Sequence, residues 1–133
     1  MDVIIVDDMI SSGESFFDVA RQIKSRGARR IVSFATFGLF TSGLDGFDRA
    51  YEEGIFDKVF TTNLIYTDPD IKKREWYVEV NMSKYVSYII DTLNHDESIS
   101  LILDPVKKIH SLLDKRNAER NAKQLSIFGG DNK

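Results

Sequence analysis

The sequence contains no cysteine and only two histidines among its 133 residues. Without cysteine the chain forms no disulfide and no thiolate zinc site, and two histidines are too few for a histidine-rich metal centre. No apolar run approaches the roughly 20 residues that span a bilayer. Asp2, Asp7 and Asp8 stand where a secretory signal needs basic and apolar residues. These absences predict a cytoplasmic chain without membrane contact.

Charge is unevenly distributed along the chain. The net charge is −3, yet residues 105–133 hold seven Lys/Arg against three Asp/Glu, so this segment carries +4 and the first 104 residues carry −7. Nucleic-acid-binding domains usually show a basic face across the whole domain. We therefore expect the basic segment to be a solvated helix, and we expect no nucleic-acid partner.

The most informative stretch is the opening one, where a short apolar run ends in two carboxylates. Val3–Val6 is β-branched and apolar on both faces, which is typical of a strand buried on both sides of a parallel sheet. Asp7 and Asp8 follow as an acidic turn, and the loop Ser11–Ser15 leads into a helix. Free N–H groups at a helix N-terminus suit a phosphate, and paired carboxylates suit sugar hydroxyls or a hydrated Mg²⁺. This order predicts a sugar-phosphate site.

Helical and strand patterns alternate along the rest of the chain. Apolar residues at helical spacing predict a helix from Phe16 to Ile23, which Gly27 ends in a left-handed conformation. The further expected elements are strands at 31–35, 58–62 and 76–80, a loop at 36–43, a helix at 44–51 ended by Gly54, a helix at 82–93, a last helix that begins at Pro105 and fades near Asn117, and a mobile segment from Gln124. This β–α–β order is typical of a parallel sheet with right-handed crossovers.

The acidic pair and its loop resemble the ribose-phosphate diphosphokinase (PRPP synthetase) family, within the wider phosphoribosyltransferase fold. The resemblance lies in Val3-Ile4-Ile5-Val6-Asp7-Asp8-Met9-Ile10 and Ser11-Ser12-Gly13-Glu14-Ser15, and it continues through Gly27-Ala28, Thr36 to Ser42, Thr62-Asn63 and Glu97-Ser98-Ile99-Ser100. It implies an α/β fold, a mainly parallel sheet flanked by helices, of the type I phosphoribosyltransferase kind. It also implies that residues 1–103 are the C-terminal domain of an N-terminally truncated synthetase, and that residues 104–133 are a helical extension and mobile tail.

The resemblance implies binding of ribose 5-phosphate within an enzyme that transfers diphosphate from ATP to this sugar, making PRPP for nucleotide biosynthesis. The substrate-binding residues would be Asp7, Asp8, Ser11, Ser12, Gly13, Glu14 and Ser15. Asp7 and Asp8 would hold the ribose hydroxyls and Mg²⁺, the latter directly or through water. The family's ATP-binding half has no counterpart here, so no catalytic residue is expected in this chain, and the chain alone is expected to be inactive. The family also implies a homo-oligomer.

Two residues depart from the family pattern. Glu14 stands where a glycine is usual, and Phe37 where a histidine is common. These departures motivate a second hypothesis, a non-catalytic regulatory or assembly module.

Three other interpretations remain open at this point. A response-regulator receiver domain also ends its first strand in an acidic pair, but here Asp57 precedes the strand 58–62 instead of following it. A salvage phosphoribosyltransferase would need a purine-recognition segment, which is missing. Ser12 or Ser15 could also serve simply as a helix N-cap.

Overall fold

The computed structural model describes residues 1–96, 98–100 and 104–128. These residues divide between two compact units, 1–85 and 86–133. Glu97, from the expected family match, and the end of the tail, 129–133, lie outside the described residues. The division expected from the sequence, at residues 103 and 104, stays a prediction.

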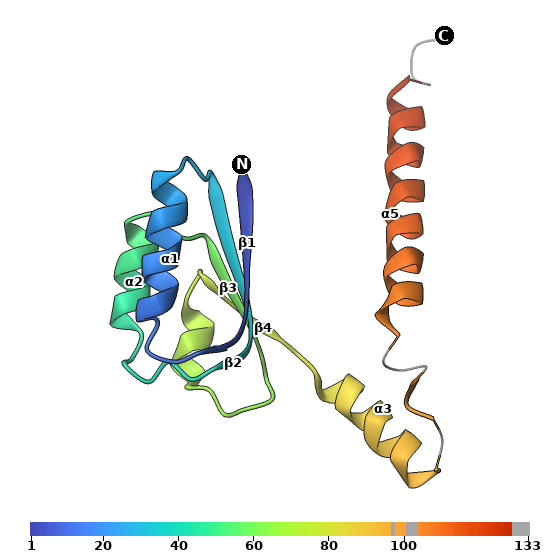
Figure 1. Cartoon of the computed structure of the whole chain (residues 1–133). Helices are drawn as coiled ribbons and strands as arrows, with labels where there is room; N and C mark the ends of the chain where they lie inside the picture. Colours follow the sequence, from blue (N-terminus) through green and yellow to red (C-terminus); the bar gives the residue numbers. More distant parts are fainter. Residues whose placement is uncertain (97, 101–103, 129–133) are drawn as a thin grey trace. The chain divides into compact units, whose positions relative to one another are not determined.

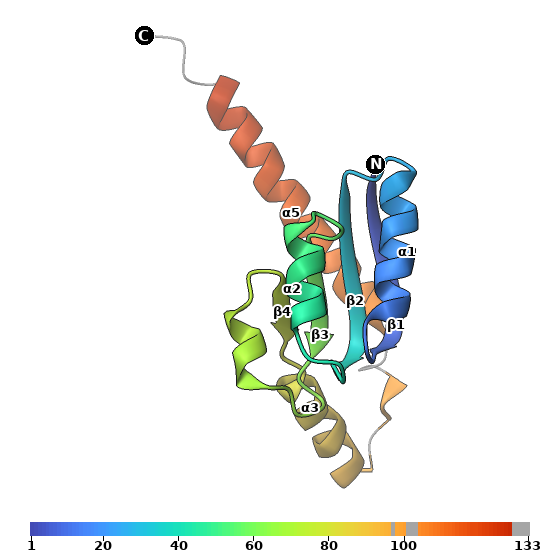
Figure 2. The same cartoon turned by 90° about the vertical axis from the view of Figure 1, so that its left-hand side faces the viewer.

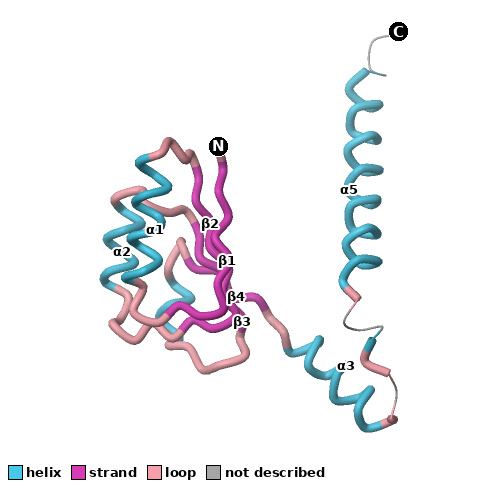
Figure 3. Tube along the Cα trace, viewed as in Figure 1, coloured by secondary structure: helices cyan, strands magenta, loops and turns pink. Residues whose placement is uncertain are grey.

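The first unit is built on a four-stranded parallel sheet in the order β1-β2-β3-β4. Figure 3 shows these strands in magenta, with helices in cyan beside them. The strands are β1 (Asp2–Ile10), β2 (Arg30–Gly38), β3 (Lys58–Thr62) and β4 (Tyr77–Val80). Their connections are the helices α1 (Glu14–Ser25) and α2 (Asp45–Glu52) and the 3₁₀ helix η1 (Pro69–Lys73). Both α-helices cover the same face of the sheet (Figures 1 and 2). The expected α/β class with a parallel sheet is confirmed.

An aromatic core lies between these helices and the sheet. Phe47 of α2, Phe56 before β3 and Trp76 before β4 are each at most 2% exposed. The Phe47 and Trp76 rings stack with centroids 5.3 Å apart. Asp48 accepts hydrogen bonds from Trp76 Nε1 at 2.7 Å and from Arg74 Nε at 2.9 Å. The core therefore joins α2 to the segment that enters β4, because both the apolar and the polar contacts connect the same elements.

The opposite face of the sheet carries apolar side chains that range from half-buried to largely exposed, which corrects the expected burial on both faces. Val6, Phe34, Phe60 and Val78 occupy one row across the four strands. Val6 is 78% exposed, and the Phe34 and Phe60 rings stack at 4.6 Å. Right-handed crossovers between sequentially ordered strands bring all their helices to one side, which leaves this row without a helix from those connections.

Strands β1 and β2 are longer than the sequence suggested. Asp7 and Asp8 lie inside β1 instead of in a turn, and residues 36–38 belong to β2 instead of a loop. The pairing of the two strands continues through Asp7↔Ala35 and Ile10↔Gly38. Because backbone hydrogen bonds make the ladder, the strand continues past the point where its side chains become polar.

Helices α3 (Ser83–Asn94) and α5 (Pro105–Phe128) each begin after a side chain that accepts a backbone hydrogen bond from the first turn. Asn81 Oδ1 accepts a hydrogen bond from Ser83 N at 2.9 Å at the start of α3. Asp104 Oδ1 accepts one from Val106 N at 3.0 Å at the start of α5. The expected end near Asn117 is wrong, since the following Ala, Arg, Lys and Gln residues favour helix. Within the described part of the chain, no helix has the length and apolar character needed to cross a bilayer.

Candidate functional site

The acidic pair lies at the carboxyl end of β1. Asp7 and Asp8 are both exposed, and the backbone N–H of Asp8 donates to Asp7 Oδ1 at 2.8 Å. Within residues 1–96, 98–100 and 104–128, neither carboxylate forms an ion pair with Lys, Arg or His. Two neighbouring negative charges without a cationic partner are available to a ligand or a metal ion.

The alternation of side chains along β1 changes just after this pair. Val3 and Ile5 pack against the core on the face that carries α1 and α2. Beyond Asp7 the pattern shifts, so that Ile10 is 4% exposed while Met9 is 44% exposed. Asp7 lines a small cavity of about 80 Å³ together with Ile10 and the first turn of α1, and Asp8 does not line it. The two carboxylates therefore have different surroundings.

Gly13 shapes the loop that follows. It is the N-cap residue of α1 with φ +91°, a left-handed conformation that favours glycine. A Cβ atom at this position would lie 2.4 Å from Phe47 Cζ, so the loop also needs the missing side chain for its approach to the core. The expected alternative, Ser12 or Ser15 as N-cap, is wrong.

The start of α1 presents backbone N–H groups that the helix itself does not use. The first intrahelical bond runs from Phe17 N to Gly13 O at 2.9 Å, which leaves the N–H groups of Ser15 and Phe16 without an intrahelical acceptor. Ser12 Oγ accepts only a long hydrogen bond, 3.4 Å, from Glu14 N. These donors and the positive end of the helix dipole make an environment that suits an anion.

The loop after β2 supports the loop after β1. Thr41 N donates to Ser11 O at 3.1 Å, and Leu39 N donates to Ile10 O at 2.8 Å. The hydroxyls of Ser11 and Thr41 are 3.4 Å apart. The sequence placed Thr41 in an expected loop at 36–43 and in the stretch that resembles the family. The backbone hydrogen bond now identifies it as a residue that positions the candidate phosphate loop.

Ser12 and Glu14 face a second, larger hollow. This cleft of about 520 Å³ between α1 and α2 is also lined by Phe17, Arg21, Ser42, Gly43, Asp45, Gly46, Arg49, Ala50 and Glu53. Glu14 is exposed and, among the described residues, forms no ion pair. Solvent therefore screens the charge that replaces the family's usual glycine.

The residues at the ends of β2 and β3 that resemble the family pattern make mainly structural contacts. Thr62 Oγ1 donates to Thr36 O at 2.6 Å, which ties β3 to β2. Asn63 Oδ1 accepts from Met82 N at 2.7 Å. Phe37, in the place where the family commonly has histidine, is 36% exposed near the end of β2.

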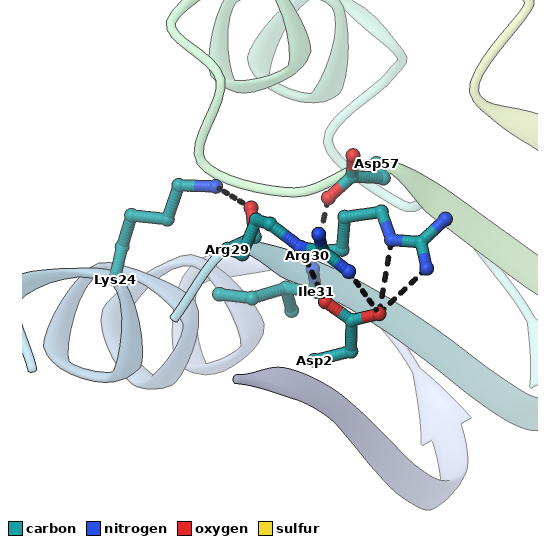
Figure 4. A network of polar contacts seen from close by, with 6 residues as sticks. All are labelled: Asp2, Lys24, Arg29, Arg30, Ile31 and Asp57. Atoms are coloured by element: carbon teal, nitrogen blue, oxygen red, sulfur yellow. Dashed lines mark hydrogen bonds and ion pairs between the residues drawn. The ribbon is translucent and has the colours of Figure 1, made fainter. Parts of the chain in front are cut away.

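A polar network of another kind occupies the amino-terminal edge of the sheet (Figure 4). Arg29 Nε donates to Asp2 Oδ1 at 3.1 Å and Arg30 Nη2 to Asp2 Oδ2 at 2.6 Å. The hydrogen bonds from Arg29, then those from Arg30, hold the pKa of the Asp2 carboxyl well below its usual range. Asp57 Oδ2 accepts from the backbone N–H of Ile31 at 2.8 Å. Asp57 thus makes a structural contact. This position gives no support to the hypothesis that Asp57 is the phosphoacceptor of a receiver domain.

No group of three or more His, Cys, Asp or Glu side chains in the described ranges could together hold a metal ion. An all-protein metal cage is therefore not present among those residues. The acidic pair remains a suitable partner for a cation such as Mg²⁺, which keeps several waters and takes one or two carboxylates with substrate phosphates.

Residues 2–104 match the family model described as the phosphoribosyl synthetase-associated domain. The chain belongs to this family. Similar proteins include the ribose-phosphate pyrophosphokinase of Mycoplasmopsis pulmonis, 31% identical over 97 residues, which are 73% of this chain and 29% of the relative. The ribose-phosphate pyrophosphokinase of Pasteurella multocida is 33% identical over 99 residues, 74% of this chain and 30% of the relative.

A solved structure of the same kind supports the fold. The phosphoribosylpyrophosphate synthetase from Mycobacterium smegmatis is similar with a TM-score of 0.60 at 20% identity, over 70% of this chain and 30% of that one. The chain thus spans less than a third of the length of these relatives. The expected family is confirmed, whereas the assignment to the C-terminal portion of a synthetase stays a prediction.

Proposed function

We propose that this chain is the ribose 5-phosphate-binding part of a PRPP synthetase. The observation that carries the proposal is the order at the carboxyl end of β1: Asp7 and Asp8 without a cationic partner among the described residues, then the loop 11–15 at the start of α1. The membership of residues 2–104 in the phosphoribosyl synthetase-associated family supports it.

In this proposal the loop and the acidic pair bind opposite ends of the sugar phosphate. The N–H groups of Ser15 and Phe16, with the hydroxyls of Ser11, Ser12 and Ser15, donate to the 5-phosphate oxygens. Asp7 and Asp8 accept hydrogen bonds from the vicinal ribose hydroxyls, since a carboxylate is an acceptor with two oxygens. Gly13 contributes by letting the loop turn beside Phe47.

Mg²⁺ is the cofactor that fits this donor set. Asp7 and Asp8 would hold it directly or through water, and it would neutralise charge on the phosphates as in phosphoryl transfer generally. The reaction joins the ribose 1-hydroxyl oxygen to the β-phosphorus of ATP, and AMP leaves with the bridging oxygen. Because the chain spans less than a third of its relatives, we assign ATP binding and the transfer step to the complete enzyme, a homo-oligomer in the cytoplasm.

The second candidate is a non-catalytic regulatory or assembly module. Glu14 places a carboxylate in the loop, and the row formed by Val6, Phe34, Phe60 and Val78 offers an apolar surface. A module of this kind would keep the fold and would not need to bind the sugar phosphate.

Calorimetric titration of the chain with ribose 5-phosphate, with and without Mg²⁺, separates the two candidates. We expect saturable, Mg²⁺-dependent binding that inorganic phosphate competes away. Asp8→Asn should lower the affinity roughly tenfold, because a hydrogen bond to a charged group contributes about 1.5–3 kcal/mol. Asp2→Asn, at the other end of the same strand, is the matched control and should bind normally.

Thermal unfolding of both variants shows whether the fold is preserved. Unchanged affinity in Asp8→Asn would remove the acidic pair from the site. No binding by the native chain at millimolar sugar phosphate would favour the module.

A further inference from the structure

Ser33, in the middle of β2, has a buried hydroxyl with no hydrogen-bond partner among the described residues. Its side chain faces the core, the residue is 1% exposed, and the structure provides no acceptor or donor for Oγ. Buried polar groups are nearly always paired, either with protein atoms or with ordered water. The hydroxyl therefore requires a physical explanation.

Thr61, a neighbouring buried residue, has a hydroxyl that does form a hydrogen bond with another protein side chain. Thr61 of β3 is 0% exposed and lies on the same face of the sheet, opposite Ala35 of β2. Its Oγ1 lies 2.8 Å from the hydroxyl of Tyr77 on β4. Ser33 and Thr61 thus carry buried hydroxyls on adjacent strands, of which Thr61 has a protein partner and Ser33 has none among the described residues.

Ser33 also lines the small cavity that Asp7 lines. The cavity measures about 80 Å³, and its other lining residues are Ile5, Asp7, Ile10, Ser15, Phe16 and Val19. A water molecule needs a site of roughly 10–15 Å³ or more by this kind of measure and two to four polar partners. The cavity meets both conditions, because about 80 Å³ exceeds the space that a water needs and three of the lining residues, Ser33, Asp7 and Ser15, have polar side chains.

We propose that this cavity binds an ordered water that connects Ser33 to the candidate sugar-phosphate site. The Ser33 hydroxyl donates to the water oxygen, and the water donates one hydrogen to the Asp7 carboxylate and the other to Ser15 Oγ. This arrangement satisfies the buried hydroxyl and orients one residue of the acidic pair and one of the phosphate loop. Ser33 is then a positioning residue; its effect on the sugar phosphate rests on the proposed function, whereas the water site does not.

The first test compares the loss of the two buried hydroxyls. If a water accepts a hydrogen bond from the Ser33 hydroxyl, Ser33→Ala removes that hydrogen bond. The equilibrium constant for unfolding should then rise about fivefold. Thr61→Val is the matched control, which removes a hydroxyl with a known protein partner and should also raise the constant. An unchanged or lower constant for Ser33→Ala would overturn the proposal, because removing a hydroxyl that truly lacks a partner does not destabilise the fold.

The second test detects the water directly. In the native chain we expect a nuclear Overhauser effect between water and the Ser33 amide proton, together with its loss in Ser33→Val, whose methyl groups fill the site. Ser33→Ala should move the NMR signal of the Asp7 carboxyl carbon, and Thr61→Val should leave it in place. Absence of the water signal in the native chain would overturn the proposal.

The third test keeps the two proposals distinguishable. Ser33→Ala should lower the affinity for ribose 5-phosphate about threefold while Thr61→Val leaves it unchanged, an effect on the scale of one neutral hydrogen bond. If the native chain shows the water signal but binds no ribose 5-phosphate, the proposed function fails and the water site stands. If the native chain binds the sugar phosphate and Ser33→Ala binds it equally well, the positioning role is overturned and the proposed function stands.

Discussion

The two edges of the sheet use their carboxylates in opposite ways. At the amino-terminal edge, Asp2 is bound by two guanidinium groups, and Asp57 accepts the backbone N–H of Ile31. At the carboxyl edge, Asp7 and Asp8 have no cationic partner in the described part of the chain. The fold neutralises the carboxylate at the amino-terminal end of β1 and leaves the acidic pair near the carboxyl end of this strand available, which indicates that the first serves stability and the second serves binding.

Chain topology explains which edge is which. In a parallel sheet with right-handed crossovers, every strand ends at the same edge, and each following helix begins there. Exposed backbone N–H groups and the positive ends of helix dipoles therefore collect at the carboxyl edge. Carboxylates placed there can be shared with a bound cation or sugar. The following four predictions test this division, from the largest expected effect to the smallest.

The largest effect is expected at the turn of the carboxyl edge. Gly13→Ala places a methyl group 2.4 Å from Phe47 Cζ at a residue with φ +91°. We expect a loss of about 3 kcal/mol in the free energy of unfolding, from backbone strain and overpacking together. Urea denaturation measures this loss.

Gly27→Ala is the matched control for backbone strain alone. Gly27 has φ +87°, and no atom lies within 4 Å of the place that the alanine methyl group would occupy. Gly27→Ala should therefore lower the free energy of unfolding by only about 1 kcal/mol. Equal losses for the two variants would contradict the role of the close approach to Phe47.

The second effect concerns the amino-terminal edge. Asp57→Ala leaves the backbone N–H of the buried residue Ile31 without its acceptor, which should cost about 1–2 kcal/mol in urea denaturation. Asp57→Asn keeps a side-chain oxygen in this place and should lose less. The structural role of Asp57 would be refuted by losses of the same size in the two variants.

The third effect concerns the charge in the phosphate loop. Glu14→Gln removes a negative charge at the first residue of α1 and should strengthen phosphate binding about twofold at low salt, since one exposed charge contributes roughly 0.3–1 kcal/mol. Titration with inorganic phosphate at low and high ionic strength measures it, and salt should abolish the difference. Asp18→Asn, an exposed carboxylate one turn later in α1, is the control. Weaker binding by Glu14→Gln would show that Glu14 helps to hold the phosphate.

The smallest effect is expected for Asp2→Asn, because its ion pairs with Arg29 and Arg30 are exposed and screened by solvent. Folding lowers the pKa of Asp2 from 3.8. The stabilisation is therefore fully present above that pH and is lost as the pH falls towards the pKa of the folded state. Urea midpoints of the native chain and the variant should differ slightly at pH 7 and converge in strong acid. A difference that persists unchanged in acid would exclude these ion pairs as its source.

Local sequence signals predicted the element order well. The strand expected at 58–62 is confirmed, Gly27 and Gly54 have the positive φ expected of helix ends, and the last expected helix begins at Pro105. These features depend on neighbouring residues only, so the pattern along the chain is sufficient. The end of α5 was missed because favourable helix propensity continues after the apolar spacing has faded.

The sequence named the residues of the candidate site, but it did not predict the contacts that hold them in place. The sequence placed Asp7, Asp8 and the loop 11–15 together, since they are adjacent in the chain. It could not show that the contact with Phe47 requires glycine at position 13, or that Thr41 supports Ser11. Those partners are about 30 residues away in the sequence, and nothing local marks them.

The sequence by itself determined that this is an α/β chain in which an acidic pair and then a hydroxyl-rich loop follow the first apolar run, because periodicity and local chemistry carry that information. Only the tertiary structure decided how those groups are used. It paired Asp2 with two arginines, left Asp7 without a cationic partner among the described residues, exposed one apolar face of the sheet, and placed Ser33 on the wall of the cavity beside Asp7. These outcomes depend on strand order, register and crossover handedness, which bring together residues that no local pattern connects.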